Sequence, residues 1–178
     1  MARLALFRAD ASPRIGSGHV RRCIAIARAL EGWHCRFAVS AESLNAVPEL
    51  ESQFDVQVLE REALFDAGAL GQSDLLVTDH YGIDGLYEAA AKTRQVIAID
   101  DLADRTHACS ALTDATPGRD PAAYRSLVPA GAALLLGGAY SPLRMAFARA
   151  REIRRGRSWG RRIFINFGGT DPDDCTGQ

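Results

Sequence analysis

Short apolar runs alternate along the chain with longer stretches in which apolar residues recur at helical spacing. The apolar runs predict strands at residues 4–9, 35–39, 56–59, 75–78, 96–99, 132–136 and 161–167. The helical stretches predict helices at residues 19–30, 41–54, 61–70, 84–93 and 142–154. Alternation of strand and helix is typical of α/β proteins with a parallel sheet. We therefore expect a Rossmann-like, doubly wound fold.

The first predicted helix is amphipathic. Its apolar residues lie three or four positions apart, or next to one another, at Val20, Cys23, Ile24 and Ala27, which places them on one face. We expect this face to pack on the sheet and Cys23 to lie in the core. The four cysteines of the chain show no C-x-x-C spacing, so the sequence predicts neither a zinc site nor a disulfide framework.

The pattern changes after the fifth predicted strand. A polar stretch with proline and glycine interrupts the alternation at residues 113–129, and a short basic segment occupies residues 155–160. The apolar run at residues 161–167 then opens directly into Gly168-Gly169-Thr170, as a new strand and glycine turn would. We expect a first domain over residues 1–158 and the opening of a truncated second domain over residues 159–178.

Composition narrows the class of protein. Of the 178 residues, 47% are hydrophobic and 24% are charged, as in ordinary soluble proteins. The formal net charge of −1 lacks the basic field of a nucleic-acid-binding protein. No apolar run approaches the ~20 residues of a membrane helix, and the N-terminus lacks the build of a signal peptide. We expect a cytoplasmic protein that binds neither nucleic acid nor membranes.

Polar residues gather directly after three of the predicted strands. They are Arg8 and Asp10 after the first strand, Asp79-His80-Tyr81-Gly82 after the fourth, and Asp100-Asp101 after the fifth. In an open parallel sheet, ligands bind outside the carboxyl ends of the strands. The sequence therefore predicts a site at this edge, with Asp10, Asp79 and Tyr81 as candidate substrate-binding residues.

The turn Gly16-Ser17-Gly18 precedes the first helix. Glycine lets the backbone approach a ligand closely, and a helix start offers free amides and the positive end of its dipole to an anion. A phosphate or a carboxylate would suit this position. The turn is not a G-x-G-x-x-G motif, because Arg21 stands where the third glycine should be, and no P-loop lysine follows. We expect no cofactor, and a plain strand-to-helix turn is the alternative.

His19 lies in the first turn of the same helix. The helix dipole disfavours an imidazolium there, so we expect a neutral ring, which is the form that a general base needs. We expect Asp10, at the nearby strand end, to fix the tautomer of this ring. A capping or buried structural histidine is the alternative.

The other strand ends leave several interpretations open. A metal site at Asp79 and His80 is not predicted, since neighbouring strand residues point to opposite sides. Tyr81 either stacks on a base, donates its hydroxyl to a phosphate, or only packs. Asp100 and Asp101 either cap the next segment or bind a sugar hydroxyl.

Five segments taken together resemble one family. They are Arg8-Ala9-Asp10-Ala11-Ser12, Ile15-Gly16-Ser17-Gly18-His19-Val20-x-Arg22-Cys23, Asp79-His80-Tyr81-Gly82, Ile99-Asp100-Asp101-Leu102 and Phe167-Gly168-Gly169-Thr170-Asp171. This ordered set is similar to that of the UDP-2,4-diacetamido-2,4,6-trideoxy-β-L-altropyranose hydrolases of bacterial pseudaminic acid biosynthesis. Their architecture is related to that of the UDP-N-acetylglucosamine transferase of peptidoglycan synthesis, a two-domain glycosyltransferase of the GT-B type.

The resemblance implies a metal-independent hydrolysis of a UDP-linked diacetamido sugar to UDP and the free sugar, with inversion at the anomeric carbon. His19 matches the family's essential histidine and would activate the attacking water, and Tyr81 matches its active-site tyrosine. The loop at residues 16–18 would lie against the sugar and diphosphate. A second domain joined at Gly168-Gly169-Thr170 would supply most of the uridine pocket, so we expect little or no activity from this chain alone.

Three other functions stay open at this point. A GT-B glycosyltransferase would use the same histidine to deprotonate an acceptor alcohol instead of water. A catalytically incomplete domain would fold and bind without turnover. A dinucleotide-dependent oxidoreductase is a further possibility at the level of the fold, against which the missing third glycine argues.

Overall fold

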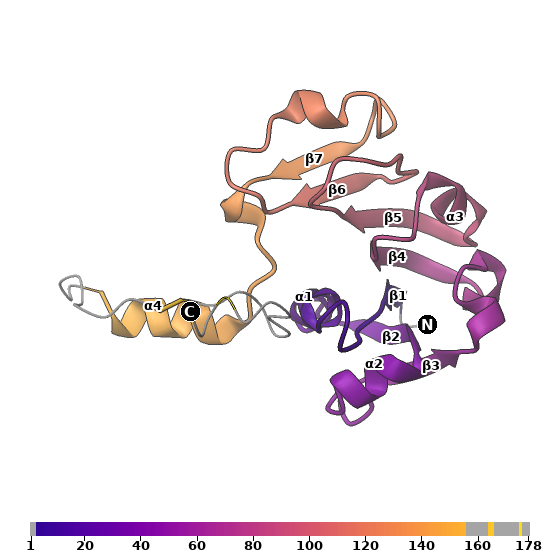
Figure 1. Ribbon diagram of the computed structural model, residues 1–178, viewed down its shortest axis with the longest axis horizontal. Helices are drawn as coiled ribbons and strands as arrows, with labels where there is room; N and C mark the ends of the chain where they lie inside the picture. Colours follow the sequence, from indigo (N-terminus) through magenta and orange to yellow (C-terminus); the bar gives the residue numbers. More distant parts are fainter. Residues whose placement is uncertain (1–2, 156–163, 166–174, 176–178) are drawn as a thin grey trace.

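The computed structural model describes residues 3–155, 164, 165 and 175, and these build one parallel sheet of seven strands in the order β3-β2-β1-β4-β5-β6-β7 (Figure 1). The strands are β1 (Arg3–Ala9), β2 (Trp33–Ser40), β3 (Asp55–Leu59), β4 (Ser73–Asp79), β5 (Thr93–Ile99), β6 (Ala111–Asp114) and β7 (Ala133–Leu136). The chain winds outward from β1 in one direction to β3 and in the other direction from β4 to β7. The predicted fold class, a doubly wound Rossmann-like sheet, is confirmed.

Helical segments connect most of these strands. The α-helices are α1 (Gly18–Ala27), α2 (Ala41–Ala46), α3 (Gly85–Ala90) and α4 (Met145–Ile153). The 3₁₀ helices are η1 (Arg61–Ala63), η2 (Ala67–Leu70), η3 (Pro121–Tyr124) and η4 (Gly138–Tyr140). No helix among the described residues is long and apolar enough to cross a membrane.

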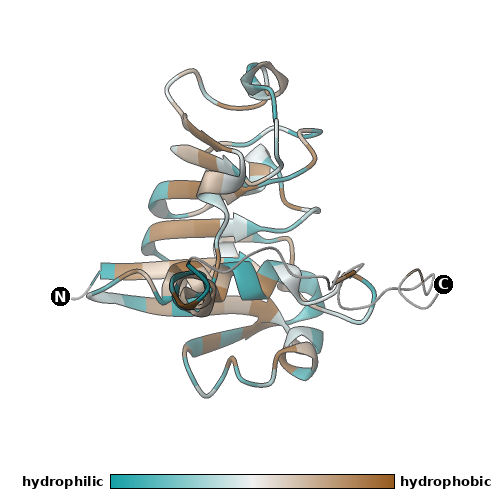
Figure 2. Cartoon of the chain, turned by 90° about the vertical axis from the view of Figure 1, so that its left-hand side faces the viewer, coloured by the Kyte–Doolittle hydropathy of each residue, from teal (hydrophilic) through white to brown (hydrophobic). Residues whose placement is uncertain are grey.

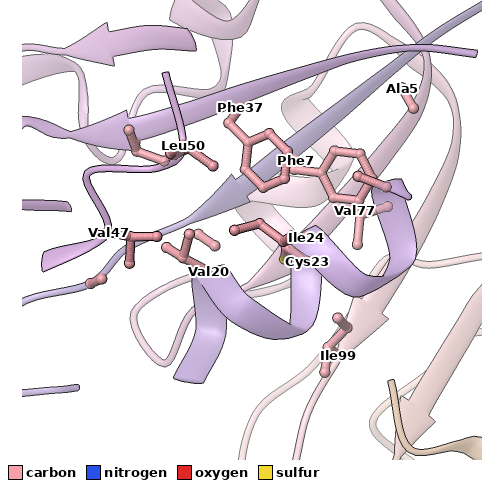
Figure 3. Close-up of a cluster of buried hydrophobic side chains, with 14 of the residues drawn as sticks. Ala5, Phe7, Val20, Cys23, Ile24, Phe37, Val47, Leu50, Val77 and Ile99 are labelled. Atoms are coloured by element: carbon pink, nitrogen blue, oxygen red, sulfur yellow. The ribbon is translucent and has the colours of Figure 1, made fainter. Parts of the chain in front are cut away.

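One face of the sheet packs against α1. Figure 3 shows Val20, Cys23 and Ile24 of this helix beside Phe7 and Val77 of the central strands. All of these side chains are buried, as the helical spacing of the apolar residues predicts. The prediction that Cys23 lies in the core is therefore confirmed.

The opposite face carries a second apolar layer. Alternate residues of the same strands, such as Leu6 and Leu76, point to this side and pack with Ile83, Tyr87 and Tyr124. Because successive strand residues point to opposite faces, a strand buried on both sides is apolar at nearly every position. Figure 2 shows brown, hydrophobic segments along the strands of the sheet, with teal segments between some of them.

Two predicted helices are wrong in extent or type. The helix expected at residues 41–54 ends at Ala46, because Pro48 restricts Val47 to an extended conformation, with φ −139° and ψ 68°. The helix expected at residues 61–70 is replaced by the two short helices η1 and η2. Asp66 interrupts the segment by accepting a hydrogen bond from the backbone N–H of Gly68, as a new helix start requires.

The strand β6 lies where the apolar pattern predicts none. Its four residues are too few to show a period, and Thr113 and Asp114 read as the start of a polar loop. The helix α4 lies to one side of the sheet (Figure 1), and none of its residues is buried.

Most of the predicted second-domain opening lies outside the described residues. This applies to Gly168, Gly169, Thr170 and the proposed boundary after residue 158. Of the strand expected at residues 161–167, only Phe164 and Ile165 are described, and the strand is not formed at these two exposed positions.

Candidate active site

Three polar strand ends meet at the carboxyl edge of the sheet, next to the start of α1. Pairing of β1 with β4 places Ala9 opposite Asp79, so that the two strands end together. Asp79 continues the side of β4 that faces α1, where Val77 lies. His80 follows on the other side, so the edge carries two separate polar clusters.

His19 forms a close pair with Asp79. The ring is buried in the first turn of α1, and its Nδ1 lies 2.6 Å from Asp79 Oδ1. An ionised carboxylate can only accept hydrogen bonds, so Nδ1 carries the proton and donates it. Within the described residues no group hydrogen-bonds the His19 Nε2, whose lone pair is therefore free. In many enzymes a carboxylate sets the orientation and tautomer of a histidine in this way, and the histidine then acts as a general base.

Arg22 completes this cluster from one turn further along α1. Its Nε donates to Asp79 Oδ2 over 2.9 Å and its Nη2 donates to Asp79 Oδ1 over 2.8 Å. The remaining amino group, Nη1, lies 3.0 Å from Asp101 Oδ2. The Arg22 Nη2 also lies 3.1 Å from His19 Nδ1, but a protonated Nδ1 cannot accept from it, and the two donors share Asp79 Oδ1 instead.

The prediction that Asp10 contacts His19 is wrong. Asp10 instead accepts hydrogen bonds from Arg8 and from the backbone N–H of Ser40, and its Oδ2 lies 3.4 Å from His80 Nε2. Burial alone would raise its pKa, but the contacts with His80 and Arg8 outweigh burial and lower the pKa well below the usual carboxyl range. The alternation of side chains explains the error, since Asp10 lies on the side of the sheet that α1 does not cover.

His80 is fully engaged, in contrast to His19. Its Nδ1 accepts a hydrogen bond from the backbone N–H of Gly82 over 2.9 Å, so the ring proton is on Nε2 and points toward Asp10. Both ring nitrogens therefore have partners. Of the two histidines at this edge, only His19 has a nitrogen that can accept a proton from a substrate or water.

Tyr81 borders the His19 ring. The two rings meet edge to face with centroids 4.6 Å apart, and the tyrosine is 47% exposed. Burial raises the pKa of the phenol, and the negative charge of Asp101 raises it further. Tyr81 thus presents a protonated hydroxyl next to the histidine, as a hydrogen-bond donor to a substrate oxygen requires.

The neighbouring residues Asp100 and Asp101 have different environments. Asp100 is buried and accepts hydrogen bonds from the Ala103 backbone and the Tyr124 hydroxyl, both through Oδ2. It therefore acts as the predicted cap. Asp101 pairs with Arg22, so it belongs to the His19 cluster. Its Oδ1 is buried and has no hydrogen-bond partner within the part of the chain that the structure describes.

The two glycines of the turn before α1 have open space beside them. Gly16 has φ +76°, which favours glycine, while a side chain added at Gly18 would meet no atom of the described structure within 4 Å. Ser17 precedes α1, but its side chain makes no capping hydrogen bond and accepts one from Arg21 instead. The helix start therefore has space at Gly18, and its amides receive no side-chain cap from Ser17.

The residue that sequence reasoning missed is Arg22. Arg22 lies in a segment that resembles the hydrolase family, but no role in the site was predicted for it. The signal was present, because residues three apart on a helix share a face, which places Arg22 beside His19. Among the described residues, no set of three or more His, Cys, Asp or Glu side chains is arranged to hold a metal ion.

The chain is partly similar to a known protein. No family model matches the chain. The chain is similar to the UDP-2,4-diacetamido-2,4,6-trideoxy-beta-L-altropyranose hydrolase of Campylobacter jejuni subsp. jejuni serotype O:2, with 27% identity over 172 residues. The match covers 93% of this chain and 60% of the relative, so the chain spans less than two thirds of the length of that protein.

Proposed function

We propose that this chain carries the catalytic histidine of a hydrolase that splits a UDP-linked 2,4-diacetamido-2,4,6-trideoxy sugar into UDP and the free sugar. The observation that carries the proposal is the His19–Asp79 pair, in which Nδ1 is held and Nε2 is free. The likeness to the Campylobacter hydrolase supports the substrate class.

In the proposed reaction, His19 Nε2 accepts a proton from a water molecule as the water oxygen attacks the anomeric carbon. The bond between that carbon and the UDP oxygen breaks, and UDP leaves with the bonding electrons. Attack from the side opposite the leaving group inverts the configuration at the anomeric carbon. Asp79 stabilises the imidazolium that forms, as carboxylates do in other histidine-dependent hydrolases.

The start of α1 is the proposed site for the diphosphate. Its uncapped amides and its dipole favour a negative charge that grows as UDP departs. The backbone at Gly16, Ser17 and Gly18 leaves room for phosphate oxygens to approach. Tyr81 would donate its hydroxyl to the sugar or the phosphate.

The proposal assigns the uridine to a second domain. Gly168, Gly169 and Thr170 would contribute its first contacts. Asp10 and Asp79, also predicted to bind substrate, are held instead by Arg8 and Ser40 and by His19 and Arg22, respectively. We expect this chain alone to turn over slowly or not at all, since the relative is considerably longer.

The test is hydrolysis of the UDP-diacetamido sugar in water enriched in ¹⁸O, by this chain and by the chain joined to the implied second domain. The proposal predicts UDP release without any acceptor by the longer protein, with ¹⁸O in the sugar and none in UDP. Label in the UDP would show attack at phosphorus and contradict the mechanism. UDP release only when an acceptor alcohol is added would indicate a glycosyltransferase instead.

A further inference from the structure

Arg22 connects the two acidic strand ends that flank α1. Its guanidinium makes a two-pronged contact with Asp79 at the end of β4 and a third contact with Asp101 after β5. Two-pronged contacts between arginine and carboxylate fix the plane of the acid as well as its position. Asp79 Oδ1 is thereby held facing His19 Nδ1.

Arg22 also acts on His19 through its positive charge. An isolated buried carboxylate beside a histidine favours the imidazolium, because opposite charges within about 4–6 Å stabilise the charged form. Arg22 lies on the same carboxylate and cancels much of its charge. Burial lowers the pKa of Arg22, but Asp79 and Asp101 raise it by more, so the guanidinium keeps its charge.

The other groups around His19 do not supply the positive charge that Arg22 places beside Asp79. Tyr81 is protonated at neutral pH, because burial and Asp101 raise its pKa. The Cys23 thiol, on the next turn of α1, is neutral because burial and then Asp79 raise its pKa. Arg105 lies 6.0 Å from the Tyr81 ring and is paired with Asp100.

We infer that Arg22 is a positioning residue, which clamps Asp79 toward His19 and offsets the charge of that carboxylate so that His19 stays unprotonated at Nε2. Asp101 anchors the far side of the guanidinium. The inference deepens the proposed function, since it names the group that keeps the base in its active form.

The test is nitrogen NMR of the His19 ring during a pH titration of this chain, which needs no turnover. The signal is assigned by its loss in His19→Asn. In the unaltered chain we expect a proton on Nδ1, which donates to Asp79. In Arg22→Gln we expect the imidazolium to persist to a pH about one unit higher or more.

Two variants serve as controls. Arg21→Gln removes the same charge from the adjacent residue, which binds Ser17 and Glu49 on the exposed side of α1, and should titrate like the unaltered chain. Arg22→Lys keeps the charge and should titrate near the unaltered chain, although the two-pronged contact is lost. If Arg22→Gln titrates with the unaltered chain, the inference is wrong.

A folding failure of Arg22→Gln is covered by the double variant Arg22→Gln/Asp101→Asn, which removes the paired charges together. It should still shift upward, by less than Arg22→Gln, because Asp79 contacts His19 directly and Asp101 does not. An unshifted titration in the double variant would also overturn the inference. The proposed hydrolase is tested separately. Turnover with an unshifted His19 titration refutes only the role of Arg22. A shifted titration with no turnover by the chain joined to the implied second domain leaves that role standing and refutes the hydrolase.

Discussion

Asp10 and Asp79 lie at the ends of neighbouring strands, yet only Asp79 reaches His19. The difference follows from the two-residue period of a strand, which sends Asp79 to the side covered by α1 and Asp10 to the other side. The same period separates Asp101 from Asp100. Sequence reasoning located all four carboxylates at the correct edge, but it chose the partner of His19 by closeness along the chain instead of by strand face.

Asp79→Asn replaces one carboxylate oxygen by an NH₂ group and so tests the His19–Asp79 pair. An asparagine preserves the shape of the side chain but can turn its NH₂ toward His19, which would place the ring proton on Nε2 and remove the base. We expect the rate of UDP release to fall about 10²–10⁴-fold with little change in KM. Asp104→Asn, at an exposed aspartate that pairs with Arg105 and has no contact with His19 or Arg22 among the described residues, should retain the full rate. Equal rates in the two variants would show that Asp79 does not hold the base.

Asp10 should make the fold sensitive to acid. The contacts with His80 and Arg8 keep its pKa below the ordinary value of 3.8, so its stabilising effect is present above that value and is lost as the pH falls below it. Asp10→Asn leaves Arg8 buried without its ion pair, and we expect the free energy of unfolding at pH 7 to drop by roughly 3–5 kcal/mol.

Urea unfolding at pH 7 and at pH 3 measures this effect. The loss of stability between the two pH values should be smaller in Asp10→Asn than in the unaltered chain. Asp104→Asn should keep the original acid dependence. An Asp10→Asn variant with the original acid dependence would contradict the assignment.

The turn that leads into α1 combines two glycines with different constraints. Gly16 has a positive φ, so Gly16→Ala should destabilise the chain by about 1–2 kcal/mol. Gly18 has a helical backbone and open space around it, so Gly18→Ala should leave the melting temperature nearly unchanged. The added methyl group would nevertheless obstruct the proposed diphosphate site, and we expect KM for the UDP-sugar to rise about tenfold, equivalent to ~1.4 kcal/mol.

Calorimetry and steady-state kinetics on both variants check this prediction. The proposal for the diphosphate fails if Gly18→Ala binds the UDP-sugar as well as the unaltered protein does.

The helix α3 depends on a close backbone approach that the sequence does not reveal. A side chain at Gly85 would lie 3.2 Å from backbone atoms of His107 and Ala108. The contact holds Glu88 of α3 in place to accept hydrogen bonds from Thr78 and from the Ala108 backbone. We expect Gly85→Ala to lower the free energy of unfolding by about 1–3 kcal/mol.

Gly131→Ala is the matched control, since a side chain there would contact no described atom within 4 Å. It should change stability by less than about 0.5 kcal/mol. Equal urea midpoints for the two variants would mean that α3 can shift without cost.

Elements with a clear period could be predicted, and elements decided by local backbone contacts could not. The apolar residues of α1 recur at helical spacing, which predicted both the helix and the side of it that packs on the sheet. The early end of α2 depends on Pro48, and the replacement of a helix by η1 and η2 depends on a side chain of Asp66 bonding to Gly68. Three of the four residues of β6 are buried, by neighbours that lie far away in sequence.

On the scale of the whole molecule, the strand order turns two distant segments into one site. The sheet reverses its winding between β1 and β4, which is where ligands bind in open α/β sheets. His19 follows β1 and Asp79 ends β4, 60 residues apart along the chain. The fold class and this edge were predictable from the alternation of strands and helices, while the pairing across the edge required the register of β1 with β4.

The proposed mechanism depends on His19 Nε2 accepting the proton of the attacking water. The most direct measurement is the kcat of UDP release by the chain joined to its implied second domain, with His19→Asn compared with His34→Asn. His34 lies at the opposite end of the sheet beside Asp55. The account predicts a loss of about 10²–10⁴-fold in His19→Asn and an unchanged kcat in His34→Asn. A folded His19→Asn variant that keeps the original kcat would contradict it.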